Sequence, residues 1–152
     1  MTLIVQVKKL SHKEFTEIEK LVSICFNEDI GSLTIGVNPK CSTHYYVMVE
    51  NKIVSYLELY RSRIFNLCTH PDYRNRGYAK QLIQHVIENS KLQDLYLYCG
   101  KDNIVAKNLY SSFGFQNLIE YKEDNFMIRT TEKKILLLLQ KKLENCIINF
   151  FP

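Results

Sequence analysis

The sequence feature with the clearest chemistry is a basic loop that contains a glycine and lies between a strand and a helix. The loop follows an apolar segment ending before Pro71, and its sequence is Arg74-Asn75-Arg76-Gly77-Tyr78-Ala79-Lys80. Unpaired N–H groups and the positive end of the helix dipole make a helix N-terminus an anion site. Gly77 permits close approach of an anion to the backbone. These residues predict a phosphate or pyrophosphate site; the alternative is an ordinary connection with solvated arginines.

Three further side chains are candidates for a catalytic role. Cys68 and His70 are two residues apart on the strand before the loop, so both are expected on one face of it. A Cys–His nucleophilic pair is one interpretation, and a small buried cysteine is the commoner one. Glu58 alternates with Tyr56 on an earlier strand and is a candidate general base. The alternative for Glu58 is a solvated or ion-paired carboxylate.

The hydrophobic pattern predicts the elements that position these residues. A helix is expected after Ser11, which forms a capping box with Glu14. The segments 28–43 and 122–125 are expected to be a long loop and a turn that shape a substrate pocket. Strands are expected at 3–8, 44–50, 52–60, 63–69, 95–99, 116–121 and 126–130, and further helices at 77–90, 103–113 and 131–149. This order predicts an α/β (α+β) fold, a mixed sheet with helices on both faces.

Composition limits the class of protein. The chain has 152 residues, of which 46% are hydrophobic and 24% charged, which favours a folded domain over disorder. Its net charge of +4 suits an anionic cofactor or substrate and is too small to indicate nucleic-acid binding. The 5 cysteines form no C-x-x-C pair, so we expect reduced thiols in an intracellular, cytoplasmic protein and no metal site. We expect no signal peptide and no transmembrane segment.

Two motifs resemble the GNAT superfamily of N-acetyltransferases. The segment from Arg74 to Ala79 is similar to its R/Q-x-x-G-x-G/A signature, and Leu67, Pro71 and Tyr73 fit the usual residues before it. A second segment resembles the superfamily's N-x-x-A-x-x-L-Y-x-x-x-G-F pattern at the expected distance, through Asn103, Ala106, Leu109, Tyr110, Phe113, Gly114 and Phe115. The resemblance covers roughly residues 2–130. It implies a GNAT-type, mostly antiparallel sheet of about seven strands.

The resemblance also implies a function, the transfer of an acetyl group from acetyl-CoA directly to a primary amine of a small molecule or peptide. It places the pyrophosphate on the backbone of the loop, and N–H groups near Cys68 and Thr69 at the thioester carbonyl. It makes Tyr110 the acid that protonates the departing thiolate, and Asn103 a contact of the pantetheine arm. The cofactor-binding residues are then Cys68, Thr69, Arg74, Asn75, Arg76, Gly77, Tyr78, Ala79, Lys80 and Asn103.

The sequence departs from the superfamily pattern at the general base. Many relatives place a glutamate where this chain has Arg63, and N-terminal acetyltransferases often place Glu or His where it has Tyr98. Glu58 is the remaining candidate. A site without a strong base suits an amine of low pKa, since an α-amino group is roughly 10–15% neutral at pH 7. The alternative function is a non-catalytic acyl-CoA-binding or regulatory module of the same fold.

Residues 131–152 follow the resembling region, which is the expected domain 1–130. Apolar residues share about one third of the circumference of the helix expected there. These residues are Ile135, Leu136, Leu139, Leu143, Cys146, Ile147 and Phe150. Three interpretations stay open: packing on the domain, a homodimer seam, and a helix that binds a membrane surface or a partner.

Overall fold

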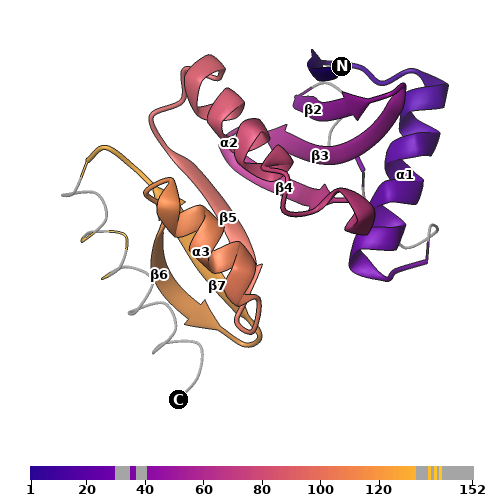
Figure 1. Cartoon of the computed structure of the whole chain (residues 1–152). Helices are drawn as coiled ribbons and strands as arrows, with labels where there is room; N and C mark the ends of the chain where they lie inside the picture. The colour runs from indigo at the N-terminus through magenta and orange to yellow at the C-terminus, as the bar shows by residue number, and fades with distance from the viewer. Residues whose placement is uncertain (30–34, 37–40, 133–136, 138, 140, 142–152) are drawn as a thin grey trace. The chain divides into compact units, whose positions relative to one another are not determined.

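The chain is described here from a computed structural model covering residues 1–29, 35–36 and 41–132 and the single residues 137, 139 and 141. Its internal contacts divide it into two compact units, Met1–Lys91 and Leu92–Pro152. Figure 1 shows the elements of both units along the chain. All but a few residues of the helix expected at 131–149 lie outside the described residues, as does most of the loop expected at 28–43.

The first unit contains an antiparallel sheet in the order β1-β2-β3-β4. The strands are β1 (Thr2–Val7), β2 (Ser42–Val49), β3 (Lys52–Tyr60) and β4 (Arg63–Thr69). The turn between β2 and β3 falls on Glu50 and Asn51, with φ of 48° and 63°. The sequence placed the end of the strand 44–50 one residue too late. It was wrong there because Val49 pairs with Lys52, which leaves Glu50 and Asn51 as the turn.

Strand β4 carries a bulge that the sequence analysis did not anticipate. Tyr56 of β3 pairs with Cys68, whereas Glu58 pairs with Phe65, so β4 has one extra residue between these two pairs. Asn66 lies in this stretch with φ of 52°, a left-handed conformation that asparagine adopts more readily than most residues. The bulge re-aims the last residues of β4, which lead into the basic loop.

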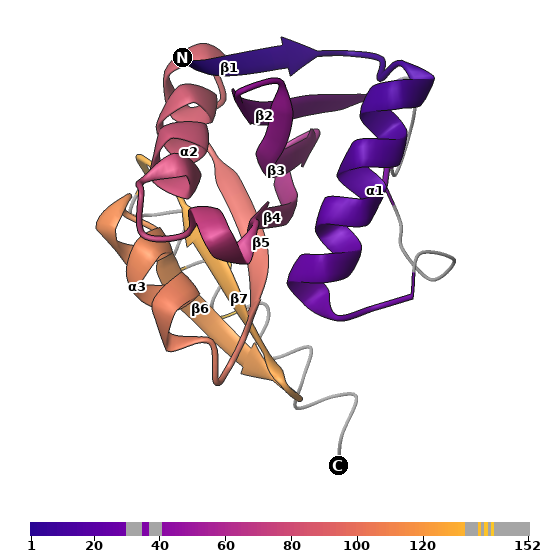
Figure 2. The ribbon, with the colours of Figure 1, turned by 45° about the vertical axis from the view of Figure 1, so that its right-hand side comes forward.

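Helices α1 (His12–Phe26) and α2 (Tyr78–Asn89) cover opposite faces of this sheet. Tyr46 packs in one buried cluster with Ile18 of α1, while its neighbour Tyr45 contacts His85 of α2. Adjacent strand residues point to opposite faces, so the two helices lie on different sides, as Figure 2 shows. The expected capping box of α1 is present between Ser11 and Glu14.

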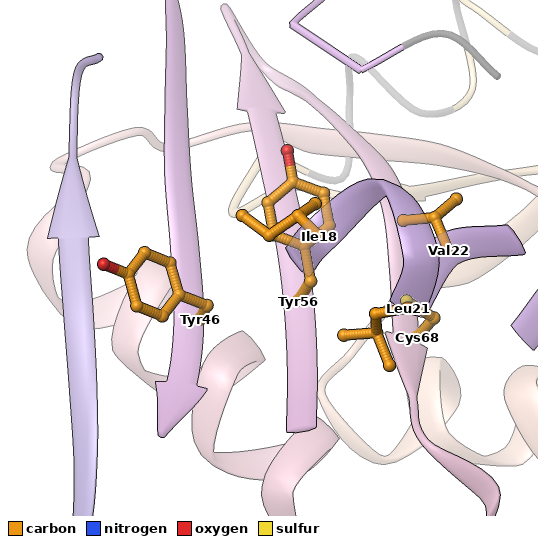
Figure 3. Close-up of a cluster of buried hydrophobic side chains, with 6 residues drawn as sticks. All are labelled: Ile18, Leu21, Val22, Tyr46, Tyr56 and Cys68. Atoms are coloured by element: carbon orange, nitrogen blue, oxygen red, sulfur yellow. The ribbon is translucent and has the colours of Figure 1, made fainter. Parts of the chain in front are cut away.

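A cluster of buried side chains holds α1 against the sheet. Figure 3 shows α1 lying over neighbouring strands, with Tyr46 on β2, Tyr56 on β3 and Cys68 on β4. Burial of this kind of apolar surface contributes most of the stability that fixes a helix on a sheet. The cluster consists of Ile18, Leu21, Val22, Tyr46, Tyr56 and Cys68.

The second unit is a three-stranded antiparallel arrangement with one helix. Its elements are β5 (Leu95–Gly100), α3 (Ile104–Ser112), β6 (Gln116–Tyr121) and β7 (Asp124–Arg129), with β7 between β5 and β6. The turn before β7 is only Lys122-Glu123, shorter than the predicted 122–125. Asp124 and Asn125 already pair with Tyr121 and Glu120 of β6, and the buried Asn125 bonds Asn117.

The fold class expected from the sequence is confirmed. The described residues form seven strands and three α-helices, with antiparallel pairing within each unit. The expectation of helices on both faces of a sheet is met in the first unit. The prediction missed one element, a short 3₁₀ helix, η2 (Pro71–Tyr73), between β4 and α2.

Candidate functional site

The basic loop leaves β4 through η2, which His70 initiates. The N–H of His70 donates to the carbonyl of Val54 at 2.8 Å and is the last backbone bond to β3. Pro71 has no N–H to continue a ladder. The His70 Nδ1 accepts the N–H of Asp72 at 3.2 Å, and its ring lies edge-on to Tyr73. This geometry gives His70 a capping role at the strand exit.

The two loop arginines are held by backbone carbonyls. Arg74 Nε donates to the carbonyl of Thr69 at 3.1 Å, and Arg76 donates to the carbonyl of Asp72 at 3.1 Å. The Arg76 guanidinium also lies over the Tyr73 ring, 5.1 Å from its centroid. Both side chains are exposed. Their positive charge is therefore fixed beside the loop and remains accessible to an anion.

Helix α2 begins without a side-chain cap. Gly77 is its N-cap with φ of 81°, preceded by Asn75 at φ of 61°, so the backbone turns through left-handed conformations. An N-cap glycine offers no acceptor to the N–H groups of the first turn, which comprises Tyr78, Ala79 and Lys80. A Cβ on Gly77 would meet no atom within 4 Å, so the space around it is open. An uncapped helix start with open space before it is a geometry that suits an anion, and the phosphate site itself stays a prediction.

The end of β4 is fixed by Ser55 of β3. The Ser55 hydroxyl donates to the carbonyl of Cys68 at 2.8 Å and lies 2.9 Å from the Thr69 hydroxyl. Ser55 and Arg74 together thus hold the carbonyls of both residues and the Thr69 hydroxyl. Cys68 and Thr69 end β4, and η2 separates them from the loop residues 74–80.

Cys68 also belongs to a thiol pair that sequence reasoning missed. Cys25, near the end of α1, packs against the buried cluster that contains Cys68. A hydrogen bond with the Cys68 thiol, and then the Arg74 guanidinium, lower the pKa of Cys25. The same hydrogen bond, and burial, raise the pKa of Cys68. Cys25 is therefore the more easily ionised thiol of the two.

The carboxylate of Glu58 is completely buried on the α1 side of the sheet. One of its oxygens accepts the Ser42 hydroxyl at 2.7 Å. The other accepts the Gly36 N–H at 3.0 Å and the Tyr56 hydroxyl at 3.5 Å. Burial of an ionised carboxylate requires such donors, because desolvation of the charge is otherwise costly. Glu58 is thus placed among hydrogen-bond donors and away from solvent.

His44 extends this group of buried polar residues. Its Nδ1 lies 2.7 Å from the Tyr56 hydroxyl, and the two rings are stacked with centroids 6.1 Å apart. Burial lowers the pKa of His44 below its usual value, although the carboxylates of Glu58 and Glu14 act in the opposite direction. Burial and then the charge of Glu58 raise the pKa of Tyr56, which keeps its hydroxyl protonated. A signal for His44 existed in the sequence: it falls on the same strand face as Tyr46.

In the second unit, the two candidate residues lie on α3. Tyr110 is 8% exposed, and its ring contacts Phe115 at 5.9 Å between centroids. Asn103 is the exposed N-cap of α3, and its side-chain oxygen accepts the Ala106 N–H at 3.1 Å. The asparagine and alanine of the second motif are therefore explained in part by helix capping.

Within the described residues, no group of three or more His, Cys, Asp or Glu side chains is arranged to hold a metal ion. No helix in that part of the chain is long and apolar enough to cross a membrane.

Comparison with known proteins identifies the fold. The model of the acetyltransferase (GNAT) domain family matches residues 41–117. Comparison with curated proteins gives no match. Among solved structures, Escherichia coli ElaA covers 85% of this chain and 99% of its own, with 19% identity and a TM-score of 0.73. The PaiA N-acetyltransferase from Thermoplasma acidophilum in complex with coenzyme A covers 84% and 99%, with 13% identity and a TM-score of 0.67.

A third solved structure, the ribosomal-protein-S18-alanine N-acetyltransferase from Escherichia coli, covers 88% of this chain and 97% of its own. It shares 15% identity with a TM-score of 0.68. These likenesses extend over both units and well beyond the two motifs, and they confirm the fold that the motifs implied. At such low sequence identities, these likenesses show the fold and nothing about the substrate.

The thiol pair yields a prediction about reactivity. Replacing Arg74→Ala should raise the pKa of Cys25 and slow its alkylation by iodoacetamide near neutral pH by about two- to fivefold, because the thiolate is the nucleophile. The rate is measured by mass spectrometry of the Cys25 peptide. Arg76→Ala, which removes a neighbouring loop charge bonded to Asp72, is the matched control and should leave the rate unchanged. Equal rates in all three proteins would contradict the role of Arg74.

Proposed function

The chain belongs to the acetyltransferase (GNAT) domain family, and we propose on this premise that it transfers an acetyl group from acetyl-CoA to a primary amine. The acceptor is a small molecule or a peptide. The observation that carries the proposal is the start of α2, where a left-handed Gly77 leaves the first-turn N–H groups without a side-chain cap. This geometry fits the pyrophosphate of coenzyme A.

Several neighbouring groups support the same cosubstrate. Arg74 and Arg76 present positive charge beside the uncapped N–H groups, and Lys80 adds a third cation within the first turn of the helix. Asn75 and Gly77 set the backbone path, and Tyr78 and Ala79 complete the first turn. Asn103, the exposed cap of α3, is proposed to contact the pantetheine arm. The residues present thus suit an anionic, elongated cosubstrate.

The proposed reaction is a direct transfer without an acetylated enzyme. The amine nitrogen attacks the thioester carbonyl, the new C–N bond forms, and the C–S bond breaks. Backbone N–H groups near Cys68 and Thr69 stabilise the negative charge that develops on the carbonyl oxygen. Tyr110 gives a proton to the departing thiolate sulfur. We assign the proton released by the amine to the group around Glu58, whose carboxylate lies on the α1 side of the sheet.

The nature of the base favours one kind of amine. Glu58 is sealed from solvent, so it does not meet the amine directly and acts through its neighbours. An α-amino group arrives partly neutral at pH 7, whereas a lysine amine is neutral only about once in 2500, a deficit of roughly 4–5 kcal/mol. The proposed acceptor is therefore an amine of low pKa.

A free-thiol release assay tests this function. Purified protein is mixed with acetyl-CoA and a panel of α-amino peptides, amino acids, polyamines, lysine peptides and amino sugars. Thiol release that depends on one class of amine, with the acetylated product seen by mass spectrometry, supports the transferase and names its acceptor. Calorimetric binding of acetyl-CoA without release for any amine would instead favour a non-catalytic acyl-CoA-binding module.

The pyrophosphate assignment predicts the effect of a change at the start of α2. Gly77→Ala should weaken coenzyme A binding by about 5- to 20-fold, because an L residue at φ of 81° is strained and the N–H groups move. Gly100→Ala is the matched control, since a Cβ there also meets nothing within 4 Å and its φ is not positive. Binding is measured by calorimetry. Equal affinity in Gly77→Ala and wild type would place the pyrophosphate elsewhere.

The acid assignment predicts a loss of turnover at Tyr110. Tyr110→Phe should lower kcat by about 10- to 100-fold and leave coenzyme A affinity within about twofold, because the hydroxyl acts on the leaving group. Tyr96→Phe, another tyrosine of the same unit whose ring packs on Phe126, should retain full kcat. If Tyr110→Phe retains wild-type kcat across the pH range, Tyr110 has no part in the mechanism.

A further inference from the structure

The buried polar group on the α1 side of the sheet is a continuous chain of hydrogen bonds. It runs from Glu58 through the Tyr56 hydroxyl to Nδ1 of His44, with distances of 3.5 Å and 2.7 Å. All three side chains are at most 4% exposed. Strand pairing sets Glu58 directly opposite His44, while Tyr56 lies two residues before Glu58 on the same strand face. Figure 3 shows the Tyr56 hydroxyl pointing away from Cys68.

The carboxylate determines the direction of the protons along this chain. Both Glu58 oxygens accept hydrogen bonds, from the Ser42 hydroxyl and the Gly36 N–H, as an ionised carboxylate does. The Tyr56 hydroxyl has one proton, and when it gives that proton to Glu58 its oxygen is left to accept from His44. In that arrangement Nδ1 of His44 carries the ring proton and Nε2 has a lone pair, and this is the tautomer on which the proposal depends.

The His44 ring adjoins Gly36, which belongs to the segment 28–43 that was expected to shape the acceptor pocket. Cε1 of His44, the carbon between the two nitrogens, would lie 3.9 Å from a Cβ built on Gly36. Within the described residues, His44 Nε2 has no hydrogen-bond partner. Gly36 is the described residue of that segment that lies against the ring.

His44 is neutral at the pH where this geometry would operate. Burial lowers its pKa, against the carboxylates of Glu58 on β3 and Glu14 on α1. Tyr56 faces it as a protonated phenol, and on β1 the residue opposite is the apolar Val7. Because the folded pKa lies below the usual 6.5, the imidazole is neutral at pH 7 and gains a proton only at more acidic pH.

We propose that His44 is the catalytic proton acceptor of the acetyl transfer, with Tyr56 and Glu58 as positioning residues that keep its Nε2 unprotonated. This inference rests on the proposed function. When the amine nitrogen bonds to the thioester carbon, it becomes positively charged and strongly acidic. Its proton moves to Nε2 of His44, the C–S bond breaks, and the thiolate leaves with a proton from Tyr110. The charged imidazolium is stabilised by Glu58 through the Tyr56 hydroxyl. After the turnover the imidazolium gives its proton to solvent, and the Tyr110 phenolate takes one back from solvent.

A measurement that needs no turnover tests the protonation pattern. Long-range ¹H–¹⁵N NMR of the full chain distinguishes the two neutral tautomers of each histidine. The expected result for His44 is a protonated Nδ1 and an unprotonated Nε2. Tyr56→Phe should shift the tautomer toward protonated Nε2, because the phenyl ring cannot accept from Nδ1. Tyr46→Phe is the matched control, since that hydroxyl lies on the same face and bonds Glu14. A protonated Nε2 in the wild type would overturn the proposal.

Kinetics test the catalytic role. With the amine that the panel identifies, His44→Asn should lower kcat by about 10²-fold or more and leave the affinity for acetyl-CoA unchanged. It should also remove the acidic limb of the kcat/KM profile, where wild-type His44 becomes protonated. Tyr56→Phe should lower kcat by a smaller factor. It should also displace the pH midpoint of the acidic limb of the kcat/KM profile. His85→Asn, a histidine on the α2 side of the same unit, is the control and should behave as wild type.

The outcomes separate this inference from the proposed function. Wild-type kcat and an unchanged acidic limb in His44→Asn would overturn the role of His44 and leave the transferase standing. A wild-type protein that binds acetyl-CoA and turns over no amine would overturn both. Circular dichroism and the coenzyme A affinity of each variant show whether it has folded, and Tyr56→Phe, which keeps the shape of a buried ring, provides a second variant should His44→Asn fail to fold.

Discussion

A carboxylate sealed inside an antiparallel sheet sets the constraint that the α1 side of the first unit must meet. Glu58 has no exposed surface, and an unpaired carboxylate there would cost several kcal/mol. Three donors bond the carboxylate: the Ser42 hydroxyl at the start of β2, the backbone N–H of Gly36, and the hydroxyl of Tyr56, which lies on β3 with Glu58. Gly36, which lies between α1 and β2, is thereby held against the sheet. The position of Gly36 and the proposed protonation of His44 both depend on this one buried carboxylate.

The first unit also separates its charges by function. The exit of β4 is positive, with Arg74 and Arg76 beside an uncapped helix N-terminus. The α1 side holds the carboxylates of Glu58 and Glu14. An anionic cosubstrate and a basic amine require opposite fields, and the small net charge of +4 conceals this separation. Ser55 bonds the carbonyl of Cys68, and Arg74 bonds the carbonyl of Thr69. The second bond fixes the Arg74 guanidinium to the end of β4.

The sequence predicted the features that depend on a local residue pattern. It missed the features that depend on how one strand pairs with another. The Gly77 loop was found because a glycine before an amphipathic helix has a local physical meaning. The bulge at Asn66 was missed, because an extra residue in a strand appears only when its partner strand is known. The turn before β7 was predicted too long, since pairing with β6 decides where that strand begins. The contact of Cys25 with Cys68, 43 residues away in the chain, was not foreseeable, because it depends on how α1 packs on the sheet.

The Glu58 group shows the same limit in its chemistry. Alternation placed Glu58 and Tyr56 on one strand face, yet a strand face does not reveal which residue of the next strand lies opposite. The register supplies His44, and with it the difference between a carboxylate that accepts a proton and one that orients the acceptor. A neutral imidazole with a lowered pKa is too weak to deprotonate a lysine ammonium, but it can take the proton of an amine that has already attacked. The base proposed here would favour amines that arrive neutral. It therefore favours the same low-pKa acceptor that the residues at Arg63 and Tyr98 favour, and it does so for a separate physical reason.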